Sequence, residues 1–160
     1  MDLILWRHAE AYDLSEGVNA VAQPDADMAR ELTPRGFKQA SRMASWLDRQ
    51  LPEGTKIYAS AAVRAEQTVK ALQRKYKIRT DLNPQANAEQ LLTVAQWPMS
   101  DSPVLLVGHQ PNLGAVVALL MGLQASSCNV KKGAVWWLRT RQREGNAQTV
   151  LVTVQTPEYL

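Results

Sequence analysis

Short apolar runs alternate along this chain with segments of helical periodicity, and this alternation constrains the fold more than any other feature. The clearest run, Val104–Val107, is apolar at every position, as expected for a strand that is buried on both faces of a sheet. Such a strand needs a layer of helices on each side. We therefore expect an α/β protein, a three-layer α/β/α sandwich with a mainly parallel central sheet.

The remaining elements follow the same alternation. Thr33-Pro34 has the form of a helix N-cap followed by a first-turn proline, and apolar residues then recur at helical spacing as far as Leu51. The expected elements, in order, are strand 2–7, loop 12–31, helix 34–51, strand 56–59, helix 62–76, strand 78–82, helix 88–97, strand 104–107, helix 113–120, and strands 135–138 and 149–154. Residues 143–146 between the last two strands predict a hairpin turn. No linker interrupts the series, so residues 1–160 are expected to form one domain.

Charge and composition argue against several classes of protein. The net charge of +3 is too small for a nucleic-acid-binding surface, although it suits an anionic substrate. Cys128 is the only cysteine, so no intrachain disulfide can form. The longest apolar stretch, Leu113–Leu123, is too short to span a bilayer, and the first residues lack the pattern of a signal peptide. We expect a cytoplasmic protein that binds neither nucleic acid nor membranes.

Residues capable of phosphate chemistry follow three of the expected strands. Arg7-His8 ends the first strand, Gly108-His109 ends the central one, and Ser60 ends strand 56–59, with Arg64 in the first turn of the next helix. The carboxyl ends of parallel strands meet at one edge of a sheet, where ligands bind. Two guanidiniums can hold phosphate oxygens through charge-assisted hydrogen bonds, and an imidazole can attack phosphorus. The two histidines have no neighbouring cysteine or carboxylate cluster, so we expect no metal site.

Four motifs on these segments resemble those of the histidine phosphatase superfamily. Arg7-His8-Ala9 resembles its RHG signature, residues 32–40 its LTxxGxxQA helix start, residues 60–68 its SPxxRAxQT segment, and residues 108–113 its GHxP segment. The motifs occur in the family's order. The short chain and the GHxP segment are most similar to the small phosphohistidine phosphatases of the superfamily. The resemblance implies a phosphoglycerate mutase-like fold.

The resemblance also implies a role for each matching residue. His8 matches the nucleophile, Arg7 and Arg64 match the phosphate-clamping arginines, and His109 matches the second pocket histidine, which donates to the transferring phosphoryl group. Ser60 and the backbone N–H groups near Gln110 are expected to line the pocket and bind substrate. No cofactor is implied.

The sequence departs from the family pattern in three places. Ala9 replaces a glycine, and Ala61 replaces a proline. The third departure concerns the general acid, which many relatives carry after the middle strand. Here residues 83–88 contain no carboxylate. Glu10 and Glu89 are the candidate general acids.

These features predict a metal-independent phosphatase that works through a phosphohistidine intermediate. Segment 12–31 is too short to build a deep lid, so an open pocket is expected, and an open pocket admits a side chain of a folded protein. A phosphorylated imidazole also leaves without an enzyme acid. We therefore expect phosphohistidine on a signalling or phosphotransfer protein as the substrate. The alternatives are a phosphatase or mutase for small phosphate esters, or a non-catalytic module that binds phosphorylated partners.

Overall fold

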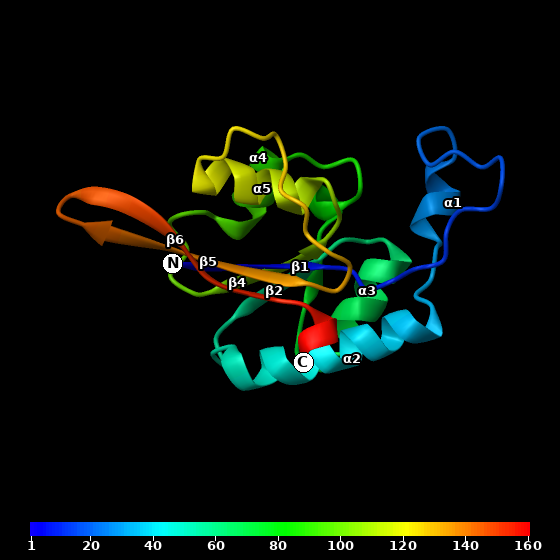
Figure 1. Ribbon diagram of the computed structural model, residues 1–160, viewed down its shortest axis with the longest axis horizontal. Helices are drawn as coiled ribbons and strands as arrows, with labels where there is room; N and C mark the ends of the chain where they lie inside the picture. Colours follow the sequence, from blue (N-terminus) through cyan, green and yellow to red (C-terminus); the bar gives the residue numbers. More distant parts are fainter.

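Strands and helices alternate in the computed structural model, which describes residues 1–160 (Figure 1). In chain order they are β1 (Asp2–Arg7), α1 (Pro24–Met28), α2 (Pro34–Gln50), β2 (Lys56–Ala59), α3 (Val63–Lys70), β3 (Lys77–Ile78), η1 (Thr80–Leu82), α4 (Ala88–Ala95), β4 (Val104–Gly108), α5 (Asn112–Met121), β5 (Val135–Arg143), β6 (Asn146–Gln155) and η2 (Pro157–Tyr159). The strands form one sheet in the order β3-β2-β4-β1-β5-β6. β3, β2, β4 and β1 are parallel, whereas β5 is antiparallel to β1 and β6.

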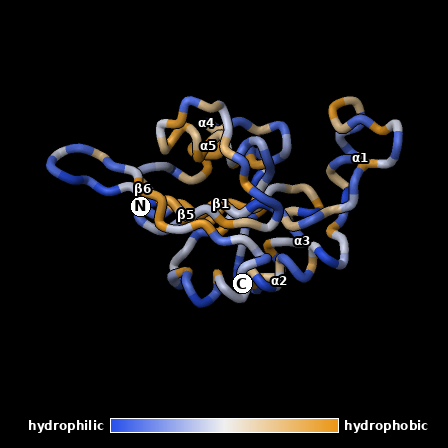
Figure 2. Tube along the Cα trace, viewed as in Figure 1, coloured by the Kyte–Doolittle hydropathy of each residue, from blue (hydrophilic) through white to orange (hydrophobic).

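Each face of the sheet carries its own apolar core. In β1, Ile4 and Trp6 pack with α2 and α3, whereas Leu3 and Leu5 pack with α4 and α5. Figure 1 shows these two helix pairs on opposite faces, and Figure 2 shows the hydrophobic strands between them. Because successive strand residues point to opposite faces, a strand buried on both sides must be apolar throughout. The expected three-layer α/β/α fold class is confirmed.

Helix α2 begins as the sequence predicts. The Thr33 side chain accepts a hydrogen bond of 3.0 Å from the backbone N–H of Gly36, and Pro34 occupies the first turn. Gly36 lies so close to the preceding segment that an added Cβ would overlap the carbonyl oxygen of Glu10. The start of α2 is therefore packed directly against the backbone that follows β1.

Three elements after α2 are shorter than predicted, one of them α4, which ends at Ala95 instead of residue 97. Helix α3 ends at Lys70 instead of Tyr76, because the chain tightens into i→i+3 hydrogen bonds and Gln73 adopts a left-handed φ of 55°. Strand β3 contains only Lys77–Ile78, at the sheet edge, and the expected strand residues 80–82 form the 3₁₀ turn η1 instead. A short run at an edge that pairs with only one neighbouring strand has little to hold it extended.

Two further regions also differ from the sequence-based prediction. The segment 12–31, predicted to be a loop, contains helix α1. The terminal hairpin is longer than expected, since β5 continues to Arg143 and β6 begins at Asn146. Glu144 and Gly145 have φ values of 52° and 81°, the positive values of the tight turns whose twist matches paired strands. No helix has the length and hydropathy that crossing a bilayer requires.

Candidate active site

Strand register brings the predicted site residues to one level of the sheet. Arg7 of β1 pairs with Gly108 of β4, and the backbone N–H of His8 then donates to the carbonyl of Gly108 at 3.0 Å. On the other side of β4, the N–H of Ser60 donates to the carbonyl of Val107 at 3.0 Å. The ends of three parallel strands therefore lie side by side, as the sequence predicts. We call Arg7, His8, Arg64 and His109 the strand-end cluster.

His8 is held in one tautomer. Its Nδ1 lies 2.7 Å from the carbonyl oxygen of Ala9, which can only accept, so Nδ1 carries the proton. Its Nε2 therefore keeps the lone pair, and the Nε–H of Arg64 donates to it at 3.4 Å. The side chain is only 6% exposed. Burial lowers the pKa of His8 well below 6.5, and the nearby His109 and the Arg64 and Arg7 guanidiniums lower it further.

Arg64, in the first turn of α3, places its guanidinium between His8 and Asp27. Its Nη1 donates to the Asp27 carbonyl at 2.7 Å, and its Nη2 donates to the Asp27 carboxylate at 3.2 Å. The residue is 3% exposed, and burial lowers the pKa of its guanidinium, although Asp27 acts in the opposite direction. The Nε–H of the guanidinium thus faces His8, and both Nη atoms face Asp27.

Asp27 is a site residue that the sequence reasoning missed. It lies on α1, is 6% exposed, and its second carboxylate oxygen accepts from Nε of Arg30 at 3.0 Å. One carboxylate therefore bridges two arginines. The signals available were the first-turn proline Pro24 and the Asp-x-x-Arg spacing, which places the two side chains on one face of a helix.

His109 lies opposite His8, with ring centroids 5.2 Å apart. The Ser60 hydroxyl donates its single proton to Oδ1 of Asn83 at 3.2 Å, so Nε2–H of His109 donates to Ser60 Oγ at 2.8 Å. Its Nδ1 then carries a lone pair, and this buried atom has no hydrogen-bond partner. Burial, followed by the Arg64, Arg30 and Arg7 charges, lowers the pKa of His109 to about 3.

Arg7 completes the cluster. Its Nη1 donates to the carbonyl of Val130 at 2.9 Å, while its buried Nε has no partner. Burial lowers the pKa of Arg7, and the Arg64 charge lowers it further. Of three buried side-chain polar atoms without a partner in the protein, two belong to the strand-end cluster. Unpaired buried polar groups are costly, and they mark a place where a polar ligand would restore the missing contacts.

The other predicted site residues lie around the cluster. Ser60 contacts it directly, whereas both ends of the Gln110 side chain bind backbone groups, the carbonyl of Cys128 and the N–H of Gly114. The Glu10 carboxylate accepts from the Thr33 hydroxyl at 2.7 Å. Glu89 lies in the first turn of α4, and its carboxylate has no hydrogen bond or ion pair. Neither glutamate carboxylate forms a hydrogen bond or an ion pair with the four cluster residues.

Three of the four cluster residues are strongly buried, since His8, Arg64 and His109 are each at most 6% exposed. Segment 12–31, expected to be a loop too short for a deep lid, contains α1, which places Asp27 against Arg64.

Comparison with known proteins agrees with this geometry. The model of the histidine phosphatase superfamily (branch 1) matches residues 3–89. The chain is 28% identical over 137 residues to the phosphohistidine phosphatase SixA homolog of Haemophilus influenzae, covering 76% of this chain and 78% of that protein.

Two solved structures show the same fold. The protein histidine phosphatase SixA complexed with tungstate has a TM-score of 0.73 at 22% identity and covers 99% of both chains. A phosphoserine phosphatase mutant from Entamoeba histolytica in complex with phosphoserine has a TM-score of 0.69 at 15% identity, covering 99% of this chain and 98% of that one. Residues 3–89, which make up more than half of this chain, carry three of the four motifs. The chain therefore belongs to the histidine phosphatase superfamily, branch 1, and is a phosphatase-like hydrolase.

Proposed function

We propose that this chain is a single-domain, cytoplasmic, metal-independent phosphatase that forms a phosphohistidine on His8 and removes phosphoryl groups from phosphohistidine on a signalling or phosphotransfer protein. One observation carries the proposal. The Nδ1–H of His8 is committed to the Ala9 carbonyl, so Nε2 presents its lone pair beside Arg64. A neutral imidazole in this tautomer is a nucleophile, and its low pKa keeps it unprotonated at neutral pH.

The first step forms one bond and breaks one bond. Nε2 of His8 attacks phosphorus, and the bond between phosphorus and the substrate nitrogen breaks, with its electron pair returning to the leaving ring. Arg7 and Arg64 contact the phosphoryl oxygens, and the unpaired Nε–H of Arg7 is a donor for one of them. Catalysis is then mainly positioning and electrostatic stabilisation, as in other phosphoryl transfers.

The second step reverses the chemistry at His8. Water attacks phosphorus and keeps both of its protons, the bond to Nε2 breaks, and the electron pair returns to Nε2 as dihydrogen phosphate leaves. The proton stays on Nδ1, hydrogen-bonded to the Ala9 carbonyl, so His8 leaves as a neutral ring and needs no acid. This step requires no metal ion.

Nδ1 of His109 becomes a hydrogen-bond donor only when a phosphoryl group is bound. Burial first, and then three guanidinium charges, keep Nδ1 of His109 unprotonated in the free enzyme. A bound phosphoryl group offsets those charges and so favours a proton on Nδ1. The protonated Nδ1 then donates to a phosphoryl oxygen, with Ser60 holding the ring through Nε2.

The positions of the carboxylates support this substrate class. Neither the Glu10 nor the Glu89 carboxylate forms a hydrogen bond or an ion pair with the cluster, and both oxygens of Asp27 already accept from guanidiniums. A sugar alkoxide leaves poorly without a proton from the enzyme. A phosphorylated imidazole can carry its own proton on the other nitrogen, because imidazole titrates at about 6.5. The SixA homolog named above has phosphohistidine phosphatase in its description, which agrees with this choice.

A substrate panel tests the proposal. We expect kcat/KM for a phosphorylated histidine phosphotransfer domain to exceed the values for sugar, nucleotide and phosphoserine monoesters, and we expect a chelator to leave all rates unchanged. Faster turnover of any simple ester would replace this proposal with a small-ester phosphatase. Phosphoprotein binding without turnover of any substrate, aryl phosphates included, would indicate a binding module.

A further inference from the structure

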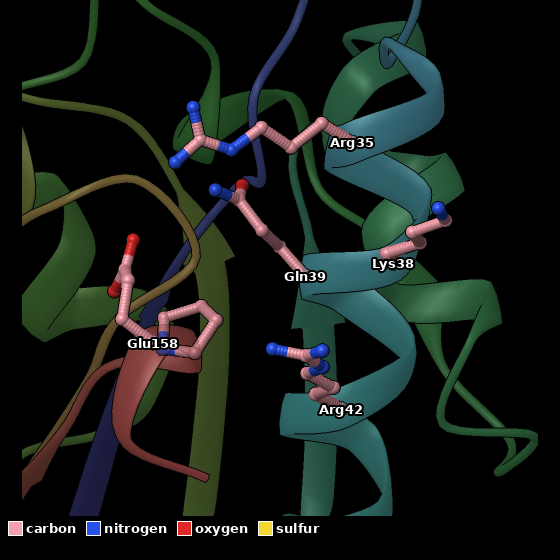
Figure 3. Close-up of a pocket in the computed structure, with 6 residues that line it drawn as sticks. Arg35, Lys38, Gln39, Arg42 and Glu158 are labelled. Carbon is pink, nitrogen blue, oxygen red and sulfur yellow. The ribbon is translucent and has the colours of Figure 1, made fainter.

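A small cavity lies beside the strand-end cluster, between α2 and the C-terminal turn η2. Its volume is about 230 Å³, and it is lined by Arg35, Lys38, Gln39, Arg42, Pro157 and Glu158. Figure 3 shows Arg35, Gln39 and Arg42 extending from α2 toward η2, with Glu158 on the opposite side, whereas Lys38 points away along the helix surface.

Three cations line this cavity together with one carboxylate, that of Glu158, which forms no ion pair with them. Arg35, Lys38 and Arg42 are exposed and recur at the spacing of one helix face. Lys38 and Arg42 take part in no ion pair, and the one acidic contact of Arg35 is with Glu10, at 4.0 Å and with 69% of the Arg35 side chain exposed.

A second basic segment meets the first at the same place. Gly133 lies against the cavity wall, where an added Cβ would come within 2.9 Å of Pro157 and 3.5 Å of Gln39. The two residues before it, Lys131 and Lys132, are exposed. We call the resulting group the basic surface; its members are Arg35, Lys38, Arg42, Lys131 and Lys132.

The basic surface is connected to His8 from both sides. The Gln39 side chain accepts from the backbone N–H of Glu10 at 2.9 Å, two residues beyond His8. The backbone N–H of Gly133 donates to the carbonyl of His8 itself at 3.1 Å. Gln39 and Gly133 are therefore each one hydrogen bond from the backbone at Glu10 and His8, so the basic surface adjoins the segment that follows β1.

We propose that the basic surface docks an acidic face of the folded protein that carries the phosphorylated side chain, with a carboxylate of that partner entering the cavity between Arg35 and Arg42. This inference rests on the proposed function. Charge complementarity favours an acidic partner, because unpaired surface cations steer an oppositely charged protein into encounter and select its orientation. The cavity gives one partner carboxylate a defined position.

Two double variants with reversed charges test whether the basic surface binds an acidic chain. The variant Arg35→Glu with Arg42→Glu is compared with Arg141→Glu with Arg143→Glu, which makes the same charge change on the exposed hairpin β5–β6, at the opposite end of the sheet (Figure 1). The probe is fluorescently labelled poly-glutamate. We expect the wild type and the hairpin variant to bind it alike, and the α2 variant to bind about tenfold more weakly or worse. Equal binding by all three proteins would overturn the proposal.

Kinetics test the same surface with a substrate. For a phosphorylated histidine phosphotransfer domain with an acidic face, kcat/KM of the α2 variant should fall about tenfold or more and lose most of its salt dependence. Its kcat/KM for an aryl phosphate should match the wild type, because so small a substrate does not reach the basic surface. Equal loss on both substrates, or no loss on the protein, would refute docking. Failure of the wild type to turn over the phosphoprotein would refute the proposed function instead, and the poly-glutamate result would still decide the docking surface.

Discussion

The guanidinium of Arg64 is held from two directions, by the lone pair of His8 and by the backbone and carboxylate of Asp27. A long side chain that is 3% exposed has few alternative positions once these contacts form. We therefore expect the Asp27 carboxylate to act through Arg64, as a positioning residue for phosphate binding. Reactions of this kind depend strongly on such placement, since a misplacement of about 1 Å can cost roughly 100-fold in rate.

Replacing Asp27 tests this role. We expect Asp27→Ala to lower kcat/KM for an aryl phosphate by roughly 100-fold and to weaken inhibition by inorganic phosphate, because Arg64 loses its orientation. Asp27→Asn keeps an oxygen acceptor for Arg64 and should retain more activity. Asp25→Asn, on the exposed side of the same short helix, is the matched control and should have no effect. An Asp27→Ala enzyme as active as the wild type would show that Arg64 needs no such support.

Some site residues could be predicted from the sequence, and others could not. Arg7, His8, Ser60 and His109 could be placed because each follows an apolar run, and the ends of parallel strands meet. Asp27 could not, because it comes from a segment without periodicity, and its contact with Arg64 spans 37 positions of sequence. The absence of a bond between the cluster and the Glu10 and Glu89 carboxylates likewise arises only from tertiary packing.

At the scale of elements, regular patterns were predictable and boundaries were not. β2 and the start of α2 appear at the predicted residues, because a buried strand and a Thr-Pro cap each have a local cause. The end of α3 is set by a left-handed Gln73 and by the Tyr76 hydroxyl, which donates to Glu66 at 2.7 Å. Neither the Gln73 conformation nor the Tyr76 hydrogen bond has a signal in the local sequence. A prediction from the periodicity of apolar residues therefore placed the end of this helix too late.

The packing of α2 against the segment that follows β1, at Glu10, can be tested by substitution. Gly36→Ala would push a methyl group into the Glu10 carbonyl oxygen, so we expect a loss of about 1–3 kcal/mol or more in the free energy of unfolding. Gly54→Ala is the control, because an added Cβ there meets nothing within 4 Å. Urea denaturation measures both variants. Equal stability of Gly36→Ala and the wild type would show that α2 and this segment can separate freely.

At the scale of the whole molecule, stability and activity are linked through two buried neutral histidines. The pKa of His109 is lowered to about 3 and that of His8 lies well below 6.5 in the folded protein, whereas both titrate near 6.5 when unfolded. Between these values the unfolded chain binds more protons than the folded one. Acid therefore favours unfolding, and the stability present above pH 6.5 is lost as the pH falls toward the folded pKa values.

The expected change of the free energy of unfolding with pH can be measured. Each histidine contributes about 1.4 kcal/mol per pH unit below its unfolded pKa, so urea denaturation should show a clear loss of stability from pH 7 to pH 5. His109→Gln should flatten this dependence, because it removes one of the two titrating groups. Identical unfolding free energies at the two pH values would mean that neither histidine is buried in its neutral form.

The most direct test of the central claim is identification of the phosphorylated residue during turnover. The enzyme is mixed with excess aryl phosphate, quenched in alkali, digested and analysed by mass spectrometry. The account predicts one phosphoryl group on the peptide that contains His8, stable in alkali and lost in acid, with no label and no turnover in His8→Ala. Arg7→Ala should slow its formation by roughly 10³–10⁵-fold, by analogy with other charge-stabilising arginines. Full turnover by His8→Ala, or a phosphoryl group that forms on another residue while His8 stays unmodified, would contradict it.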